Sequence, residues 1–235
     1  MGLHICYELT LPGAVPQEDA IAILERLREF AESLGVELTT PVFRLTGADL
    51  AAERDVHQQR TVPWLMRICS EGIREERDGT RDAVVDPDAL VVAGFLMHPG
   101  DGSESAMFGL VRPVLTARPT GAERGELWQS WFWHCCCKTQ YASRVSDEHL
   151  VHCHLSVVHM LEAAQRFGLG VEVRDETHYW ETRSTERLVA EVRNMNRIVA
   201  RFAGAMSDAL GPDHRTEGAI FDHPDFERLE SEPLD

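Results

Sequence analysis

The sequence contains almost no lysine. Of its 23 lysine and arginine residues only Lys138 is a lysine, so arginine supplies nearly all the positive charge. The bias can reflect the base composition of the source genome, and one remaining lysine can survive by accident. An ammonium on a slim stem nevertheless suits sites that a planar guanidinium does not. Lys138 lies in the aromatic, cysteine-rich run WFWHCCCKTQYAS, residues 131–143, and is therefore a candidate functional residue.

Net positive charge and long apolar runs are also missing. The formal net charge is −16 and no basic cluster offsets it, so we expect neither nucleic acid nor an anionic membrane as a partner. No apolar run reaches the ~18 residues that cross a bilayer. The first residues alternate like a strand and lack the basic and apolar regions of a signal peptide. We therefore expect a cytoplasmic globular protein, and 43% hydrophobic residues suffice for a sizeable core.

The sequence has no CxxC motif, although its cysteines are Cys6, Cys69, Cys135, Cys136, Cys137 and Cys153. Without export, cysteines are more often thiols than disulfides. Adjacent cysteines of a strand point to opposite faces, so Cys136 cannot easily bridge Cys135 or Cys137. We therefore predict that all the cysteines are reduced and unpaired. No metal site is predicted, because the histidines of HCH at 152–154 diverge on a helix and His154 falls on its apolar face.

Apolar periodicity predicts a chain of alternating strands and helices. In chain order we expect a strand at 3–10, a helix at 17–34, a strand at 36–45, a hairpin of 88–100 and 106–114, a long strand at 127–142, a helix at 147–168 and a strand at 168–176. Ser184 is placed to N-cap a last helix. The region 47–86 has no clear pattern. Beyond Gly211 the chain is acidic and interrupted by prolines, so residues 211–235 are expected to form a loosely held tail.

Two segments of the chain resemble each other. HICYELT at 4–10 aligns with HCCCKTQ at 134–140, and an amphipathic helix follows each. This pattern predicts two β-α-β halves that pair as a ferredoxin-like antiparallel sheet, with the two leading strands as central neighbours. The expected fold is thus one α+β domain over residues 1–210, with an insertion at about 47–126 and an extra C-terminal helix.

Three phrases, GDGSESAMFGL (100–110), CKTQYAS (137–143) and HCHLSVVHMLEAA (152–164), resemble segments of an uncharacterised bacterial protein family. The resemblance covers about the C-terminal two-thirds of the chain. The family pattern favours cysteine where Ser103 stands here. The resemblance implies a coherent folding unit, and because the family has no known function, it implies nothing about chemistry.

The polar sides of the two leading strands form the first candidate site. If these strands are antiparallel about a point between Cys6 and Cys136, Glu8 lies opposite His134 and His4 lies opposite Lys138. A carboxylate beside a histidine orients it for proton transfer, and a lysine on a half-buried strand can act as a base or amine nucleophile. We therefore predict Lys138, His134 and Glu8 as catalytic residues, with Gln140 and His4 as ligand-binding residues. A polar sheet face covered by other segments or another subunit is the alternative.

The loop between the hairpin strands supplies the second candidate. HPGDGSESA at 98–106 offers His98, Asp101 and Glu104 as ligand-binding side chains, and its glycines can expose backbone N–H groups as an anion nest. It matches neither a phosphate loop nor an EF-hand, so no cofactor is identified. We expect a small-molecule enzyme or ligand-binding protein with a pocket on the polar sheet face. The alternative is a non-catalytic domain that uses this face for self-association as a homo-oligomer.

Overall fold

A computed structural model describes residues 2–12, 14–46, 85–115, 130–210 and 218–231. Within these ranges the chain is α+β, with a seven-stranded antiparallel sheet and helices packed against it. The elements are, in chain order, β1 (Ile5–Leu11), α1 (Gln17–Ser33), β2 (Leu38–Thr39), β3 (Phe43–Thr46), β4 (Val85–His98), β5 (Ala106–Leu115), β6 (Trp131–Cys137), the 3-10 helix η2 (Gln140–Arg144), α5 (Asp147–Arg166), β7 (Gly170–Asp175), α6 (Tyr179–Thr182), α7 (Thr185–Leu210) and α8 (Phe226–Ser231).

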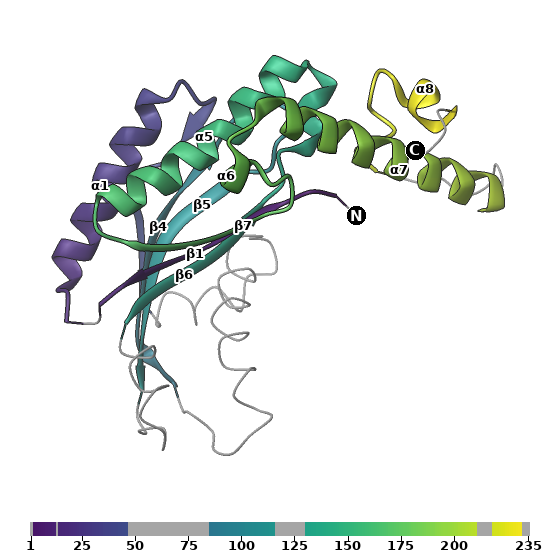
Figure 1. Cartoon of the computed structure of the whole chain (residues 1–235). Coiled ribbons are helices and arrows are strands. Elements are labelled where there is room, and N and C mark those ends of the chain that lie inside the picture. The colour runs from purple at the N-terminus through teal and green to yellow at the C-terminus, as the bar shows by residue number, and fades with distance from the viewer. Residues whose placement is uncertain (1, 13, 47–84, 116–129, 211–217, 232–235) are drawn as a thin grey trace.

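The strands lie in the order β2-β4-β5-β6-β1-β7, with β3 also paired to β4. All these neighbours are antiparallel. α1 and α5 lie along one face of the sheet, and α7 continues past the sheet, where α8 packs on it (Figure 1). Because the helices cover one face, the strands near the centre bury alternate side chains.

The register of β1 and β6 follows the prediction from the sequence. Cys6 pairs with Cys136 and Glu8 pairs with His134. Both strands have the same alternation of buried and more exposed residues. The buried sides carry Ile5, Tyr7, Leu9 and Leu11 on β1, and Trp131, Trp133, Cys135 and Cys137 on β6. A period of two with one apolar side therefore determined which face each residue occupies.

The predicted insertion does not stand apart from the sheet. Its hairpin, β4 and β5, occupies the positions between β6 and the short strands β2 and β3. Three strands therefore separate β1 from the strand that follows α1, whereas β7 returns from α5 to pair directly with β1. The remaining insertion residues, 47–84 and 116–126, lie outside the described residues.

The two longest helices of the described residues, α5 and α7, begin at serine caps. Ser146 accepts a hydrogen bond from the His149 N–H at 3.0 Å and caps α5. Ser184 accepts one from the Arg187 N–H at 3.1 Å, which confirms the predicted cap of α7. In the described part of the chain, no helix is both long enough and apolar enough to cross a membrane.

Buried aromatic side chains join the centre of the sheet to β5. Tyr7 stacks on Phe108, with ring centroids 5.2 Å apart, and Phe95 also stacks on Phe108, at 5.8 Å. The Tyr7 hydroxyl and the Trp133 indole N–H each donate to the Met107 carbonyl at 2.8 Å. A buried carbonyl is thus satisfied by side chains, which allows β5 and β6 to pair only briefly, at Val111 and Phe132.

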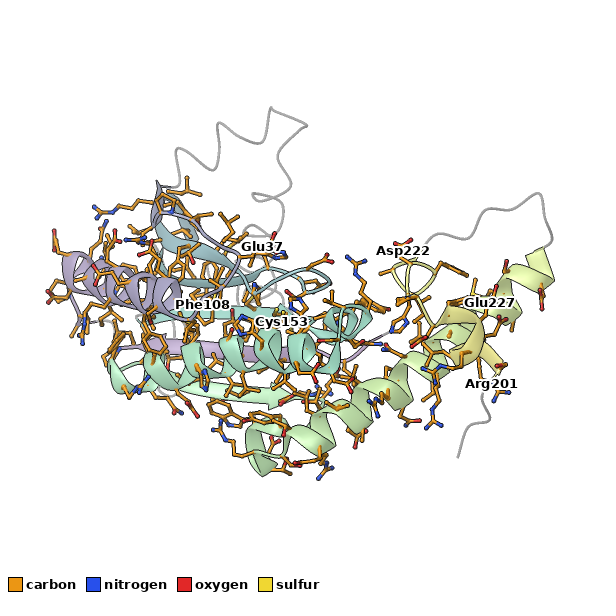
Figure 2. All side chains as sticks on the ribbon, turned by 90° about the horizontal axis from the view of Figure 1, so that it is seen from above. Glu37, Phe108, Cys153, Arg201, Asp222 and Glu227 are labelled. Atoms are coloured by element: carbon orange, nitrogen blue, oxygen red, sulfur yellow. A yellow bond between two sulfur atoms is a disulfide. The ribbon has the colours of Figure 1, made fainter. Side chains whose placement is uncertain are left out.

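Part of the acidic C-terminal segment is structured, which corrects the expectation of a loose tail for residues 218–231. Ile220 and Leu229 are buried against Val199, Ala200 and Ala203 of α7, forming a second apolar cluster. Figure 2 shows Asp222 and Glu227 near the far part of α7, away from Phe108 and Cys153 in the main body. A few apolar residues within an acidic segment were therefore sufficient for docking.

The expectation of six unpaired cysteines is wrong, because Cys6 and Cys136 form a disulfide with Cα atoms 4.0 Å apart. Neighbours along one strand point to opposite faces, but Cys6 and Cys136 are directly opposed across two strands. Opposed residues of antiparallel strands bring their Cβ atoms within about 4.5–5.5 Å, so the predicted register already placed the two side chains together. Cys135, Cys137 and Cys153 are free and buried, and Cys69 lies outside the described residues.

Candidate functional site

A pocket of about 530 Å³ lies where the turn between β4 and β5 meets the end of β6. We call it the loop pocket. It is lined by His98, Asp101, Gly102, Ser103, Glu104, Lys138, Tyr141, Arg144 and Ala219. Three predicted ligand-binding residues, His98, Asp101 and Glu104, thus share one cavity with the predicted catalytic lysine. Ala219, from the segment that docks on α7, was not predicted.

The β4–β5 loop, residues 99–105, is held close to the backbone of η2. Gly102 has a φ of 79°, and a Cβ at this position would overlap the carbonyl oxygen of Tyr141. Only glycine satisfies both conditions at once. The Ser103 N–H donates to the Gly100 carbonyl at 3.1 Å, and the Glu104 N–H donates to the Lys138 carbonyl at 2.7 Å. The N–H groups of Ser103 and Glu104 are therefore bonded within the protein and are not available to an anion.

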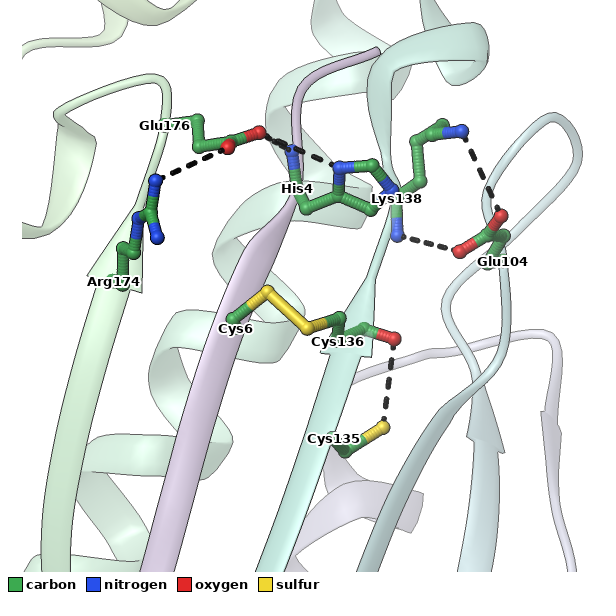
Figure 3. The surroundings of a disulfide bond; sticks show 8 residues. All are labelled: His4, Cys6, Glu104, Cys135, Cys136, Lys138, Arg174 and Glu176. Atoms are coloured by element: carbon green, nitrogen blue, oxygen red, sulfur yellow. Dashed lines mark hydrogen bonds and ion pairs between the residues drawn. A yellow bond between two sulfur atoms is a disulfide. The ribbon is translucent and has the colours of Figure 1, made fainter. Parts of the chain in front are cut away.

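Lys138 enters the loop pocket from the end of β6. Its side chain is 17% exposed, and its Nζ lies 4.0 Å from Oε1 of Glu104. That distance is an ion pair, beyond hydrogen-bond length. The main-chain N–H of Lys138 donates to Oε2 of Glu104 at 3.1 Å (Figure 3). The two oxygens of the Glu104 carboxylate thus contact the side chain and the main chain of Lys138, and they join the loop to the end of β6.

Other charges in the loop pocket are also paired. Arg144 donates to the Asp101 carboxylate, and this hydrogen bond holds the pKa of Asp101 below its ordinary value. His98 lies 3.3 Å from the Ser105 hydroxyl and 3.6 Å from Oε2 of Glu37. Burial raises the pKa of Tyr141, and the nearby charge of Glu104 adds to this effect, so its phenol stays protonated at neutral pH. The pocket therefore offers both charges and a hydroxyl donor to a ligand.

The other predicted catalytic residues do not reach this pocket. Glu8 and His134 are exposed and opposite each other, but no hydrogen bond or ion pair joins them among the residues described. His134 precedes Lys138 by four residues of extended chain, about 13 Å at ~3.3 Å per residue. The structure thus confirms their register and separates them from the lysine.

His4 and Gln140, predicted to bind a ligand, have internal partners instead. The His4 main-chain N–H donates to Oε2 of Glu176 at 2.9 Å, and its ring Nδ1 lies 3.4 Å from the same oxygen. Gln140 is buried. Its Oε1 accepts from the Leu3 N–H at 2.8 Å and its Nε2 donates to Oδ1 of Asn196 at 2.7 Å. A buried amide satisfied on both ends ties the N-terminus to α7.

The surface around the disulfide carries the residues left outside the loop pocket. We call the side of β1 and β6 that carries Cys6, Glu8, His134 and Cys136 the disulfide face. Both cysteines are partly exposed, unlike the three free cysteines described above. His4 and Lys138 lie just beyond the paired ends of the strands, and the disulfide lies between β1 and β6 below them (Figure 3).

A buried polar network was missed by the sequence analysis except for its histidine. His154 lies 3.0 Å from the Thr139 hydroxyl through Nδ1 and 3.2 Å from Oδ2 of Asp175 through Nε2. The other oxygen of Asp175 accepts from the N–H and hydroxyl of Thr177, at 2.9 and 2.7 Å. His154 is thus a satisfied core histidine, as predicted. The sequence does contain a sign of this network in the Asp-x-Thr spacing at 175–177. That spacing is typical of a turn in which an aspartate carboxylate accepts a hydrogen bond from the backbone N–H two residues later.

The Asp175 carboxyl is stabilised in its charged form. Burial acts to raise its pKa, but the hydrogen bond and charge of His154, with the bonds from Thr177, outweigh burial and lower the pKa to about 2. All four groups are almost completely buried. A substrate has no access to them, so the network fixes β6, α5 and β7 relative to one another.

The described residues do not form a metal centre. They contain no group of three or more histidine, cysteine, aspartate or glutamate side chains arranged to hold an ion. Burial raises the pKa of Cys135, Cys137 and Cys153, the last to about 11, so these thiols stay neutral. A neutral buried thiol is neither a ligand nor a nucleophile at ordinary pH.

Comparison with known protein families, with curated proteins and with solved structures gave no match for this chain.

Proposed function

We propose that the chain binds a small polar molecule in the loop pocket and that Lys138 contacts an anionic or carbonyl oxygen of that molecule. The observation that carries this proposal is that the Lys138 ammonium lacks a hydrogen-bond acceptor within the described part of the protein. Its side chain is largely buried, its Nζ lies 4.0 Å from its acidic partner, and no described residue accepts a hydrogen bond from it. An ammonium on the wall of an open pocket that lacks a protein acceptor can donate a hydrogen bond to a ligand oxygen.

The surrounding charges narrow the class of ligand. Arg144 and Lys138 supply two cations, and Asp101 and Glu104 supply two acids. A ligand with a carboxylate or phosphate at one end and an amine or hydroxyl at the other would complement both kinds of group. The pocket volume of about 530 Å³ suits a metabolite-sized molecule.

A thermal-shift screen tests the proposal. The full chain is screened against carboxylates, keto acids, amino acids, phosphates, nucleotides and divalent metal salts. We expect a compound with an anionic or carbonyl oxygen to raise the melting temperature of the native chain. Lys138→Met should remove this shift, whereas Arg174→Met, which changes an exposed cation outside the pocket, should keep it.

Self-association through the disulfide face is the competing outcome. It would give a dimeric solution mass, no ligand shift, and a return to monomer on His134→Glu. A shift that is equal in the native chain and in Lys138→Met would also end the proposal, because the ligand would then bind without the lysine.

We further propose that β1-α1 and β6-α5-β7 descend from one ferredoxin-like duplication. The proposal is supported by the central antiparallel pairing of β1 with β6, by the helix after each strand, and by the return of β7 to β1. The hairpin β4–β5 would then be a later addition inside the sheet. An experimental structure in which β1-α1 fails to superimpose on β6-α5 would contradict this origin.

A further inference from the structure

The Cys6–Cys136 disulfide differs in position from every other described cysteine. It joins the two central strands at directly opposed residues and is partly exposed on the disulfide face, whereas Cys135, Cys137 and Cys153 point into the core. A thiol reagent in solution can therefore approach this bond without opening the core. Access is the first requirement for thiol–disulfide exchange.

The charges around the two sulfurs are unequal. On β6, Cys136 lies between His134 and Lys138, each two residues away. Lys138 forms an ion pair with Glu104, 4.0 Å away, whereas no acid forms an ion pair with His134 among the described residues. On β1, Cys6 lies between His4 and Glu8. Arg174 pairs with Cys6 from β7, but Glu176 lies 3.9 Å from this arginine and 3.4 Å from His4, and so neutralises them in part (Figure 3). A thiolate is therefore stabilised better at Cys136 than at Cys6.

We propose that Cys6–Cys136 is a thiol-exchange site whose reaction partner is a low-molecular-weight thiol. The thiolate of that partner attacks Sγ of Cys6 and forms a mixed disulfide. The Cys6–Cys136 bond breaks, and its electron pair leaves on Sγ of Cys136, where the neighbouring His134 stabilises the thiolate. A second partner thiolate then attacks the partner-derived sulfur of the mixed disulfide. The oxidised partner, a disulfide of two partner molecules, is released, and Cys6 leaves as a thiolate. Protonation leaves two cysteine thiols. Two electrons pass to the protein, and oxidation reverses the sequence.

The expected compartment supports an exchangeable bond. Reducing conditions keep most cytoplasmic thiols free, and the disulfides found there are usually transient and reactive. The three buried free cysteines would not compete, because burial keeps them neutral. This site is separate from the proposed ligand site, since neither cysteine lines the loop pocket.

Reduction of the native chain by reduced glutathione tests the proposal. The oxidised full chain is incubated without denaturant, quenched with N-ethylmaleimide and mapped by peptide mass spectrometry. We expect Cys6 and Cys136 to become labelled while the buried cysteines stay unlabelled. His134→Ala should slow the reduction several-fold, whereas Thr10→Ala, on the same face of β1 and farther from the bond, should leave the rate unchanged.

The single-cysteine variants test which sulfur leaves. In Cys6→Ser the remaining Cys136 should react with iodoacetamide faster than the remaining Cys6 does in Cys136→Ser. The reverse order would overturn the assignment of the leaving sulfur. A bond that opens only in denaturant, in step with the loss of tryptophan fluorescence, would overturn the proposal as a whole and make the disulfide purely structural. Six reactive thiols in the unfolded, unreduced chain would also overturn it.

Discussion

At the scale of single residues, Lys138 has a side chain that is largely buried and an ammonium 4.0 Å from Glu104, too far for a hydrogen bond. It also lines the loop pocket. A rigid guanidinium there would form a forked contact with Glu104 and fill part of the pocket. We therefore expect Lys138→Arg to weaken the ligand found by the screen at least tenfold, ~1.4 kcal/mol. Isothermal titration measures this affinity.

Lys138→Met serves as the companion variant because it keeps the stem and removes the ammonium. Glu104 is half-exposed and stays hydrated without its partner, so this variant should fold. If Lys138→Arg binds the ligand as tightly as the native chain, the single lysine of the sequence is an accident of composition.

Asp175 carries the second residue-scale prediction. Removal of its charge leaves buried His154 without its carboxylate, and we expect Asp175→Asn to lower the free energy of unfolding by about 3 kcal/mol in urea denaturation at neutral pH. Its pKa is about 2 in the folded chain against an ordinary 3.8. Because the folded pKa lies below the unfolded pKa, the charged carboxylate stabilises the fold at pH values above the unfolded pKa. This contribution, about 2 kcal/mol, is lost as the pH falls from 4 through about 2.

The pH dependence separates this charge from simple packing. The native chain should therefore lose stability more steeply between about pH 4 and pH 2 than Asp175→Asn does. Parallel acid profiles for the two proteins would show that the carboxylate is not the group that titrates in this range.

At the scale of elements, the β4–β5 loop depends on Gly102. A side chain at this position meets both a positive φ and the Tyr141 carbonyl, so Gly102→Ala should cost about 3 kcal/mol of unfolding free energy and abolish the ligand shift. Gly35 is a matched control, because its φ is 70° and no atom lies within 4 Å of the point that a Cβ would occupy. Gly35→Ala should cost about 1 kcal/mol. Equal losses in the two variants would show that the close approach at Gly102 contributes nothing.

The second apolar cluster predicts the behaviour of α7. Truncation after Leu210 removes Ile220 and Leu229, while the main core contains no residue from this segment. We expect the melting temperature to fall by about 5 °C, since a loss of ~2 kcal/mol shifts a chain of this size by that amount. Hydrogen exchange should quicken in residues 199–210 and stay slow in β1. Unchanged hydrogen exchange in α7 after truncation would show that residues 218–231 do not stabilise the helix.

At the scale of the whole molecule, the disulfide joins residues that are 130 positions apart. Closing so long a loop restricts the unfolded chain, and the loop-entropy relation gives about 5 kcal/mol of stabilisation. The double variant Cys6→Ser, Cys136→Ser should therefore unfold at lower denaturant than the oxidised chain. Added reductant should lower the stability of the native chain and leave the double variant unaffected. Equal midpoints for oxidised chain and double variant would refute this contribution.

Thiol counting gives an independent check at the same scale. With one bond formed, the unfolded and unreduced chain should show no more than four reactive thiols of its six cysteines. This expectation replaces the prediction from the sequence that all six are free.

The local patterns were sufficient for the elements and for the central register. Period-two alternation identified β1 and β6, helical spacing identified α1 and α5, and Ser184 identified the start of α7. Each of these depends on residues close together in the chain. The end of β6 was misjudged, because the predicted strand ran to 142 whereas the chain turns into η2 at Gln140. That turn depends on contacts with Asn196 and Leu3, which lie far away in sequence.

The tertiary structure alone decided which candidate residues meet. The amino-acid sequence determined an α+β chain, the buried sides of its central strands, and Lys138 with the loop as positions of interest. It could not determine that the loop closes on Lys138 while His134 remains about 13 Å away, because four residues of extended strand separate them at ~3.3 Å each. It also placed Cys6 opposite Cys136 without revealing the bond, since pairing across a sheet becomes visible only when two strands remote in sequence lie side by side.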